Sequence, residues 1–157
     1  MGGNHKSPHQ IPTNSHIKRI IILVMPQKTT RQIIRAPDAP SSPAYSQAVR
    51  AAGLVFVSGT SPHDPATGKI AGETIQEQTR QCLTNIAAIL QAAGTSLDRI
   101  VSATVILYDE SDFPGMNEEW LKWFPPGSES GPPARQGAKM PVHLPGMKIS
   151  IAAIAEA

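Results

Sequence analysis

Hydrophobic residues return every three or four positions over residues 74–93, which is the spacing of one helix face. Thr74 and Glu77 stand three residues apart at the start of this segment, as a capping box requires, and Gly94 follows its end. The apolar stripe consists of Ile75, Cys82, Ile86, Ile89 and Ala93, widened by Leu83 and Leu90. The pattern predicts a helix over 74–93 with Cys82 as a small buried residue.

Elsewhere the hydrophobic segments are shorter, richer in β-branched residues and bounded by turn residues, which is typical of strands. Residues 47–51 and 54–58 flank Ala52-Gly53 and predict a hairpin, and residues 64–68 (DPATG) predict a tight turn. A second helix is expected over 116–124, after the break at Pro114-Gly115. The other expected strands are 30–35, 100–107, 134–142 and 148–155, and residues 37–44 form a proline-rich loop.

This order of elements predicts an α+β sandwich in which two helices cover one face of a mixed sheet. We expect residues 25–157 to form a single domain, and no internal repeat is present. The sheet face that the helices leave open is expected to carry Val55, Val57, Val105 and Ile151. Because an open apolar face is unfavourable in water, we also expect the chain to form an oligomer.

The composition is that of a globular protein: the 157 residues are 40% hydrophobic and 17% charged. The net charge is +2, but residues 1–24 hold three basic residues and no acid, so the remainder is almost neutral, with 11 Lys and Arg against 12 Asp and Glu. A near-neutral body argues against a nucleic-acid-binding surface, and no apolar run is long enough for a membrane span. Cys82 is the only cysteine, which excludes an intrachain disulfide and a cysteine-based zinc site.

Residues 1–24 have neither a helical nor a strand period. Three interpretations stay open: a disordered tail, a translation start placed upstream of the true one at Met25, or a short targeting peptide. The first two predict a cytoplasmic protein, and the third predicts a protein of the mitochondrial matrix. A metal site made of His5, His9 and His16 is disfavoured, because nothing fixes the spacing of these side chains.

Few residues of the expected domain have obvious catalytic chemistry. The chain contains no glycine-rich phosphate loop, no His-Glu-x-x-His and no Gly-x-Ser-x-Gly motif. His63 and His143 lie beside turn residues and are interpreted as solvated loop residues. Arg135 differs, because it enters a strand directly after Pro132-Pro133. A guanidinium fixed in this way either grips a carboxylate through two parallel hydrogen bonds or forms a surface ion pair, and spacing alone favours the ion pair.

Several segments, in this order, resemble the YjgF/RidA family, and the resemblance spans about residues 29–156. They are residues 43–49 (PAYSQAV), 57–60 (VSGT), 78–90 with Asn85, 112–113 (DF) with Asn117, 133–135 (PAR), and the closing run 144–151 (LPGMKISI). The Pro-Ala-Arg motif is the strongest of them.

The resemblance implies a chorismate-mutase-like fold that assembles as a barrel-like homotrimer with ligand clefts between subunits. It implies hydrolysis of reactive 2-enamino and 2-imino acids to 2-oxo acids and ammonia, which removes these intermediates without a metal or organic cofactor. An older description of the family, as endoribonucleases that inhibit translation, is the rival function. The expected partners are therefore a small 2-imino or 2-oxo acid and two further copies of the chain, and not nucleic acid.

By the same resemblance, Arg135 corresponds to the arginine that clamps the substrate carboxylate, and Tyr45 to a tyrosine that lines the cleft. Ser58 and Asn117 correspond to polar residues of the catalytic site. The expected substrate-binding set is Arg135, Gly137, Tyr45, Gly59 and Thr60. Without the resemblance, Tyr45 and Ser58 would be interpreted as groups that anchor a loop and a strand end, and Asn117 as a helix-surface amide.

Three positions depart from the family pattern. Gly137 replaces a cysteine, Thr60 replaces a glutamine, and Ala152 replaces a glutamate that positions or activates water in the archetypal member. Glu156 shares a strand face with Ala152 but lies about 13 Å further along it, too far to take its place. The alternative function is therefore a trimer that binds a small carboxylate without turnover, or that acts on another enamine.

Overall fold

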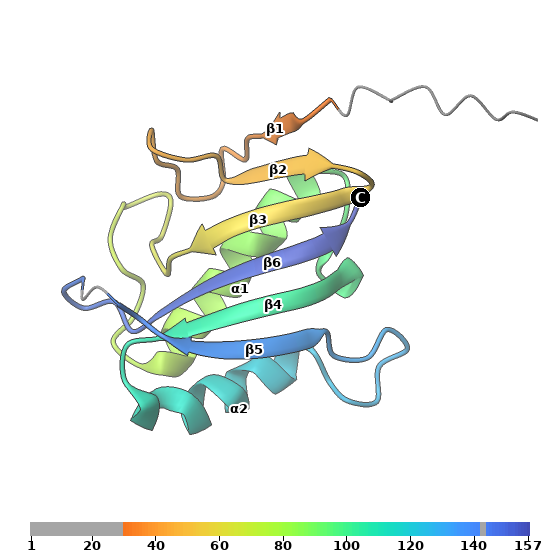
Figure 1. Cartoon of the computed structure of the whole chain (residues 1–157). Coiled ribbons are helices and arrows are strands. Elements are labelled where there is room, and N and C mark those ends of the chain that lie inside the picture. Colours follow the sequence, from red (N-terminus) through yellow and green to blue (C-terminus); the bar gives the residue numbers. More distant parts are fainter. Residues whose placement is uncertain (1–29, 142–143) are drawn as a thin grey trace, which may run out of the picture.

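The computed structural model describes residues 30–141 and 144–157, which form a six-stranded sheet and two helices (Figure 1). Across the sheet the strands follow the order β1-β2-β3-β6-β4-β5. Their bounds are β1 Gln32–Ile34, β2 Ala48–Ala51, β3 Leu54–Thr60, β4 Ile100–Leu107, β5 Ala134–Lys139 and β6 Ile149–Glu156. The helices are α1 Ile75–Ala92 and α2 Phe113–Trp123, and the short 3-10 turns η1 Leu97–Arg99 and η2 Glu110–Asp112 precede β4 and α2.

The sheet is mixed, as predicted. β4 and β5 pair in parallel, and the other neighbouring strands pair antiparallel. Both helices lie on one side of the sheet, with α1 behind β3, β6 and β4 and α2 beside the β5 edge (Figure 1). The predicted α+β class with two helices on one face is confirmed.

The hairpin of β2 and β3 turns at the expected pair. Ala52 and Gly53 have φ angles of 51° and 77°. Positive φ at both central residues is the requirement of a two-residue turn that matches the twist of the strands. β3 continues to Thr60, two residues beyond the predicted end.

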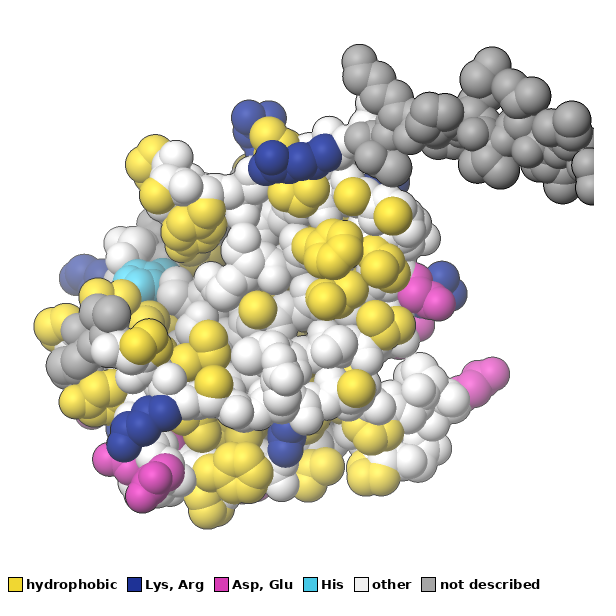
Figure 2. All heavy atoms as spheres, in the orientation of Figure 1, with side chains coloured by type: hydrophobic (Ala, Val, Ile, Leu, Met, Phe, Trp, Pro, Cys, Tyr) yellow, Lys and Arg dark blue, Asp and Glu magenta, His cyan; other side chains and the backbone are white. Residues whose placement is uncertain are grey.

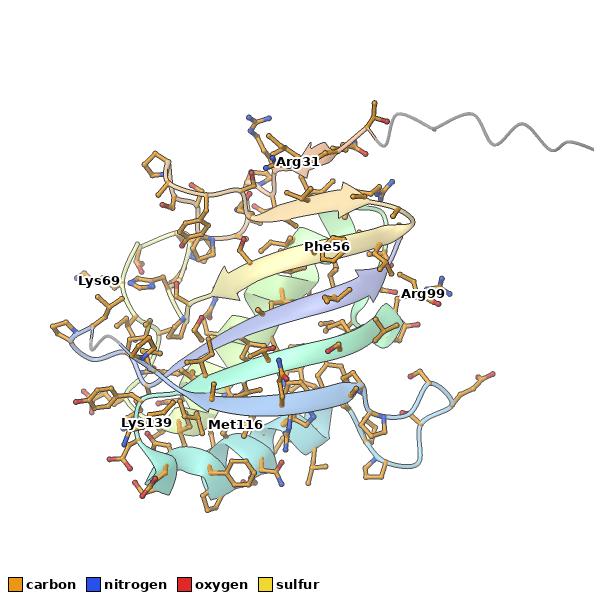
Figure 3. All side chains as sticks on the ribbon, viewed as in Figure 1. Arg31, Phe56, Lys69, Arg99, Met116 and Lys139 are labelled. Carbon is orange, nitrogen blue, oxygen red and sulfur yellow. The ribbon has the colours of Figure 1, made fainter. Side chains whose placement is uncertain are left out.

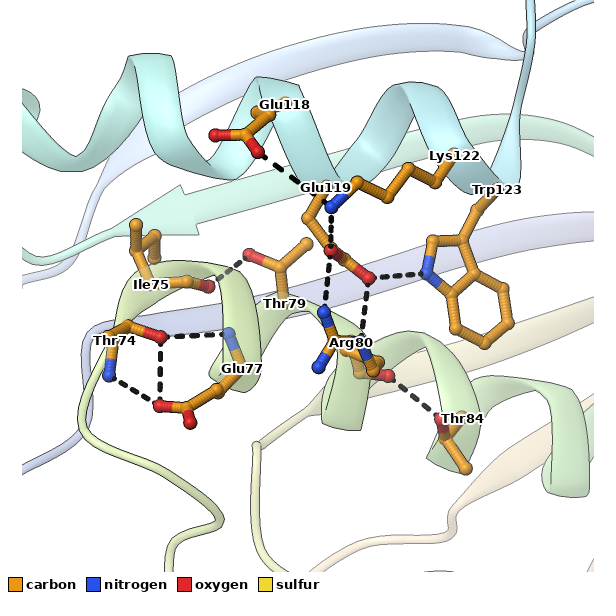
Figure 4. Close-up of polar contacts among 10 residues, drawn as sticks. All are labelled: Thr74, Ile75, Glu77, Thr79, Arg80, Thr84, Glu118, Glu119, Lys122 and Trp123. Atoms are coloured by element: carbon orange, nitrogen blue, oxygen red, sulfur yellow. Dashed lines mark hydrogen bonds and ion pairs between the residues drawn. The ribbon is translucent and has the colours of Figure 1, made fainter.

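α1 begins and ends as predicted. The Thr74 hydroxyl accepts a hydrogen bond from the Glu77 backbone N–H at 3.2 Å, and the Glu77 carboxylate accepts one from the Thr74 N–H at 3.0 Å (Figure 4). Gly94 follows the helix with a φ of 75°. The face toward the sheet is buried and includes Ile75, Cys82, Leu83, Ile86, Ile89 and Leu90.

α2 begins at Phe113, three residues earlier than predicted. Pro114 and Gly115 lie in its first turn instead of breaking the chain before it. Proline is tolerated there because the first N–H groups of a helix have no partner within the helix. Gly115 allows a close approach to α1, since a Cβ atom there would come within 2.6 Å of Ile75 Cγ2.

The prediction of which residues face outward from the sheet is wrong. Val55, Val57, Val105 and Ile151 are buried against the helices. The residues that alternate with them point to the open face of the sheet. Phe56 is one of these and is 42% exposed. Figure 2 shows hydrophobic side chains gathered around the position of Phe56, which is labelled in Figure 3. Both sets of alternating strand positions contain apolar residues, and a shift of one residue exchanges the two faces. Hydrophobicity alone therefore did not show which set faces the helices.

Some expectations fall outside the described residues. These are the interpretations of residues 1–24 with their three histidines, the start at Met25, and the role of His143.

The strand predicted over 134–142 ends at Lys139 in the structure. His63 does lie in a loop, where its Nδ1 is 2.8 Å from Ser61 Oγ.

Candidate functional site

Arg135 lies on β5, the strand at one edge of the sheet. β5 runs parallel to β4, and the register pairs Arg135 with Ala103. Paired residues on neighbouring strands have their side chains on the same face, and Ala103 is buried against the helices. The Arg135 side chain therefore points to the helix side of the sheet, toward α2.

Four side chains of α2 surround the guanidinium of Arg135. Its Nη2 donates a hydrogen bond to Asn117 Oδ1 at 2.8 Å, and its Nη1 lies 3.9 Å from Met116 Sδ. The guanidinium carbon is 5.0 Å from the ring centroid of Trp120 and 5.8 Å from that of Phe113. Of the four, only Asn117 was predicted to belong to the site, although their spacing places all four on one helix face.

Arg135 is charged and is not paired with a carboxylate in the part of the chain that the structure describes. Burial lowers its pKa, but an arginine stays protonated at neutral pH. The ion pair that spacing alone favoured is therefore absent there. A guanidinium has five N–H bonds, and the contacts with Asn117 and Met116 leave the others for a ligand.

A cavity of about 470 Å³ opens beside this guanidinium. It is lined by Val105, Leu107, Glu110, Phe113, Met116, Arg135, Gly137, Ala138 and Lys139. Gly137 forms a bare part of the wall, since an added Cβ would meet only the Val105 carbonyl oxygen, at 4.0 Å. The volume is in the range of small-molecule sites. We call Arg135, Asn117 and Gly137 the arginine half-site.

A β-bulge places Ser58 and Gly59 opposite Ala152. Val57 pairs with Ala153 but Thr60 pairs with Ile151, so two residues of β3 oppose one residue of β6. Ala152 is also paired with Thr104, whose other neighbour is Gln136 on β5. Ala152 thus faces the open side of the sheet, whereas Arg135 faces the helices.

The remaining predicted site residues gather at this bulge. The Ser58 hydroxyl donates to the Ser46 carbonyl oxygen at 2.7 Å, which ties β3 to the segment that carries Tyr45. The Thr60 hydroxyl donates to the Ser58 carbonyl oxygen at 2.9 Å. The Tyr45 side chain is 56% exposed. We call Tyr45, Ser58, Gly59 and Thr60 the bulge half-site.

The two half-sites are far apart in one chain. β6 and β4 lie between β3 and β5, and three strand spacings amount to about 14 Å. One chain therefore brings Arg135, Asn117 and Gly137 together, and it brings Tyr45, Ser58, Gly59 and Thr60 together, but it does not join the two groups.

The helix that surrounds Arg135 is fixed to α1 through Glu119, whose side chain is buried (Figure 4). The Glu119 carboxylate accepts two hydrogen bonds from Arg80, both at 2.9 Å, one from Lys122 at 3.0 Å and one from Trp123 Nε1 at 3.2 Å. Burial alone would raise the pKa of Glu119, but the bonds from Arg80, Lys122 and Trp123 outweigh it and lower the pKa. This network could not be predicted from the sequence, because no motif marks it.

Other kinds of site have little support in residues 30–141 and 144–157. Within these ranges no three His, Cys, Asp or Glu side chains lie close enough together to hold a metal ion. Cys82 is buried, and burial raises the pKa of its thiol far above the normal value, which suits a structural cysteine. No helix of the described part has the length and apolar character to span a membrane.

Comparison with known proteins gives consistent matches over most of the chain. A family model described as endoribonuclease L-PSP matches residues 34–157. A RutC family protein of Pyrococcus horikoshii is 44% identical over 60% of this chain and 75% of its own length. A 2-iminobutanoate/2-iminopropanoate deaminase of Capra hircus is 36% identical over 80% of this chain and 89% of its own length.

Solved structures of similar proteins have the same fold as this chain. The crystal structure of E. coli TdcF with bound serine superposes with a TM-score of 0.73 and 34% identity, covering 80% of this chain and 98% of that one. The relatives also include proteins named as chloroplastic, from Arabidopsis thaliana, and as mitochondrial, from Schizosaccharomyces pombe.

Proposed function

The chain belongs to the YjgF/RidA family, whose sequence model is described as endoribonuclease L-PSP, and we propose that it hydrolyses 2-imino acids to 2-oxo acids and ammonia. The 2-enamino tautomers of these acids enter the same reaction. Relatives named reactive intermediate deaminase and 2-iminobutanoate/2-iminopropanoate deaminase support this reaction class.

The observation that carries the proposal is the state of Arg135. Its guanidinium is flanked by rings and sulfur, has no carboxylate partner in the described residues, and borders a small cavity. A planar guanidinium with free N–H bonds binds a carboxylate through two parallel hydrogen bonds. Every 2-imino acid has a carboxylate next to the reacting carbon, so the clamp fixes that carbon in the cavity.

The chemistry at the clamped substrate is an addition followed by an elimination. Water adds to the C=N carbon and gives a carbinolamine; a proton moves to the nitrogen, the C–N bond breaks, and ammonia leaves as the C=O bond forms. The atoms balance as imino acid plus water to oxo acid plus ammonia. Imines hydrolyse unaided, so orientation by Arg135 together with exclusion of other poses accounts for part of the acceleration.

We propose that the complete site forms between two copies of the chain in a homotrimer. The arginine half-site of one subunit would meet the bulge half-site of its neighbour, since one chain cannot join them. The open sheet face with Phe56 and Val101 is the apolar surface that assembly would cover. Light scattering should give about 50 kDa for chains of 16.7 kDa each. A stable monomer at micromolar concentration would contradict the shared site.

A direct test is to generate 2-iminobutyrate with a threonine dehydratase and to measure the release of 2-oxobutyrate and ammonia with and without the protein. Faster release with the parent protein, and a slower rate with Arg135→Ala, would support the function. A rate equal to the buffer rate would contradict turnover. In that case calorimetric titration with 2-oxobutyrate would still measure the clamp.

A second candidate function is a trimer that binds a small carboxylate without hydrolysing imines. Ala152 favours it, because the archetypal glutamate is absent at the position opposite Ser58 and Gly59. The loss of a general base costs about 10²- to 10⁴-fold in rate. Tight 2-oxobutyrate binding without acceleration of imine hydrolysis would identify this function.

We propose a cytoplasmic location, with the mitochondrial matrix as the alternative if residues 1–24 are a targeting peptide. The two differ in a simple experiment. A fluorescent protein fused after residue 24 should stay diffuse in the first case and enter mitochondria in the second.

A further inference from the structure

The guanidinium of Arg135 is in contact with several side chains of α2. Among the surrounding side chains, Trp120 provides the nearer of the two aromatic rings, at 5.0 Å from the guanidinium carbon. The side chain of Trp120 is 3% exposed, and its ring packs on Phe124 with the centroids 4.5 Å apart. The ring is therefore packed in the core, and it offers the guanidinium a buried and well-supported surface.

Asn117 restrains the same guanidinium in a second direction. Its Oδ1 accepts the hydrogen bond from Nη2 at 2.8 Å, and it stands one helical turn before Trp120. A ring contact limits the tilt of the guanidinium plane, whereas an in-plane hydrogen bond limits its rotation. Together they restrict the orientation of the N–H bonds that remain.

The platform is stable because α2 is fixed at a neighbouring residue. Glu119 precedes Trp120 and receives both hydrogen bonds of the Arg80 guanidinium from α1 (Figure 4). Met116, whose sulfur lies beside the Arg135 guanidinium, is also buried (labelled in Figure 3). β5 thus directs the Arg135 side chain to the helix side of the sheet, and residues of α2 and the core surround its guanidinium.

We propose that Trp120 is a positioning residue for the carboxylate clamp. Its indole ring holds the guanidinium of Arg135 by cation–π attraction, so that the free edge faces the cavity before a ligand arrives. Arginine side chains have many rotamers, and an arginine that is already ordered loses less freedom on binding. The inference rests on the proposed ligand class, a 2-oxo or 2-imino carboxylate, but it does not depend on turnover.

A double-mutant cycle tests it by calorimetric titration of 2-oxobutyrate into the full chain. Trp120→Met removes the ring and keeps much of the volume, and it should weaken binding about 3- to 30-fold, the range expected for a partly desolvated cation–π contact. In the Arg135→Ala background the same change should have little further effect, because the ring acts through the guanidinium. Equal losses in both backgrounds, or no loss in either, would overturn the proposal.

Trp123→Met is the matched control. Trp123 lies on the same helix, but its indole N–H donates to Glu119, and its ring is not one of the two that lie over the Arg135 guanidinium in the described residues. It should lower the melting temperature without changing 2-oxobutyrate affinity by more than about twofold. An affinity loss as large as that of Trp120→Met would show a general effect of α2 packing and would overturn the positioning role.

Should Trp120→Met not fold, Trp120→Tyr and Trp120→Phe decide the question. Rings attract cations in the order Trp, then Tyr and Phe. Affinity that falls from the parent to these variants supports the proposal; equal affinity in all three overturns it. A parent protein that binds no 2-oxobutyrate overturns it as well, whereas a parent that binds but does not hydrolyse contradicts only the proposed function.

Discussion

The arginine half-site and the bulge half-site use polar groups in opposite ways. At the first, the Arg135 guanidinium lies between two aromatic rings and a sulfur, so most of its N–H groups are not hydrogen-bonded within the chain. At the second, the hydroxyls of Ser58 and Thr60 both donate to backbone carbonyls of their own chain. The difference teaches that the first half-site supplies a charged binding group, whereas the second supplies shape and backbone together with one exposed side chain, Tyr45.

Ala152 lies at the bulge half-site. The bulge brings it beside Ser58 and Gly59, on the open face and not beside Arg135 of the same chain. A glutamate there would add the ionisable group that the bulge half-site lacks. The catalytic and the binding contributions would then come from different subunits.

Ala152→Glu is expected to have the largest effect. If only general-base assistance is lacking, imine hydrolysis should rise by about 10²- to 10⁴-fold, with 2-oxobutyrate affinity within a few-fold of the parent. Ala152→Gln is the control, because it has a similar shape and cannot accept the proton. A parent rate that is already high and does not respond to Ala152→Glu would show that no base is missing at this position.

Arg135→Lys should weaken 2-oxobutyrate binding by tenfold or more. It keeps the charge but removes the planar pair of N–H donors, and hydrogen bonds to charged groups contribute about 1.5–3 kcal/mol each. Calorimetry measures the change. Arg99→Lys is the control. Arg99 is half-exposed, forms an ion pair with Glu156 at 2.8 Å and does not line the cavity. Unchanged affinity in Arg135→Lys would remove the clamp from the mechanism.

Mixing two inactive variants tests whether the half-sites come from different chains. Arg135→Ala and Tyr45→Ala each damage one half-site, and subunits that are refolded together in equal amounts should exchange at random. About a quarter of the interfaces then combine two intact half-sites, so about a quarter of the parental activity should return. A mixture as inactive as either variant alone would place both half-sites in one cleft of one chain.

Glu119→Gln should reduce stability by about 1–2 kcal/mol at neutral pH, because Arg80 and Lys122 lose a charged acceptor but are half-exposed and partly solvated. The pKa of Glu119 is lowered in the folded protein, so its contribution is present above the normal value of 4.5 and is lost as the pH falls through the folded pKa. The difference in melting temperature between parent and variant should therefore shrink below about pH 4.5. A difference that is constant with pH would assign the loss to packing.

Deletion of residues 1–24 should have the smallest effect. These residues lie outside the described part of the chain, and their composition predicts that they bury little surface. The melting temperature should change by less than about 2 °C, and neither half-site should lose affinity. A fall of many degrees in scanning calorimetry would instead show that the segment 20–24 packs on the domain.

The sequence predicted the elements well where local chemistry determines them. The capping box of Thr74 and Glu77 fixed the start of α1, and Ala52-Gly53 fixed the hairpin. The Pro114-Gly115 signal was misinterpreted because the same pair can end one segment or begin a helix close to another. That choice depends on Ile75, which is distant in sequence.

The site was predictable only in part. Family resemblance pointed to Arg135 and Asn117, and the structure brings these two into contact. The ring of Trp120 and the bulge at Ser58 and Gly59 arise from the approach of segments far apart in the chain, so no local pattern marks them. The prediction of which strand residues face outward was wrong for the same reason, because the packing of the helices determines which face of the sheet is covered.

β5 is the last strand of the sheet, and all of its residues are exposed in the single chain. An unpaired edge can pair with the edge of another molecule and start aggregation, and charged side chains on such a strand oppose this. Arg135 and Lys139 provide those charges here, after two prolines that cannot donate backbone hydrogen bonds. We therefore expect Arg135 to oppose edge-to-edge pairing of newly made chains as well. Arg135→Lys keeps that protection, whereas an apolar substitution would lower both ligand affinity and the yield of soluble protein.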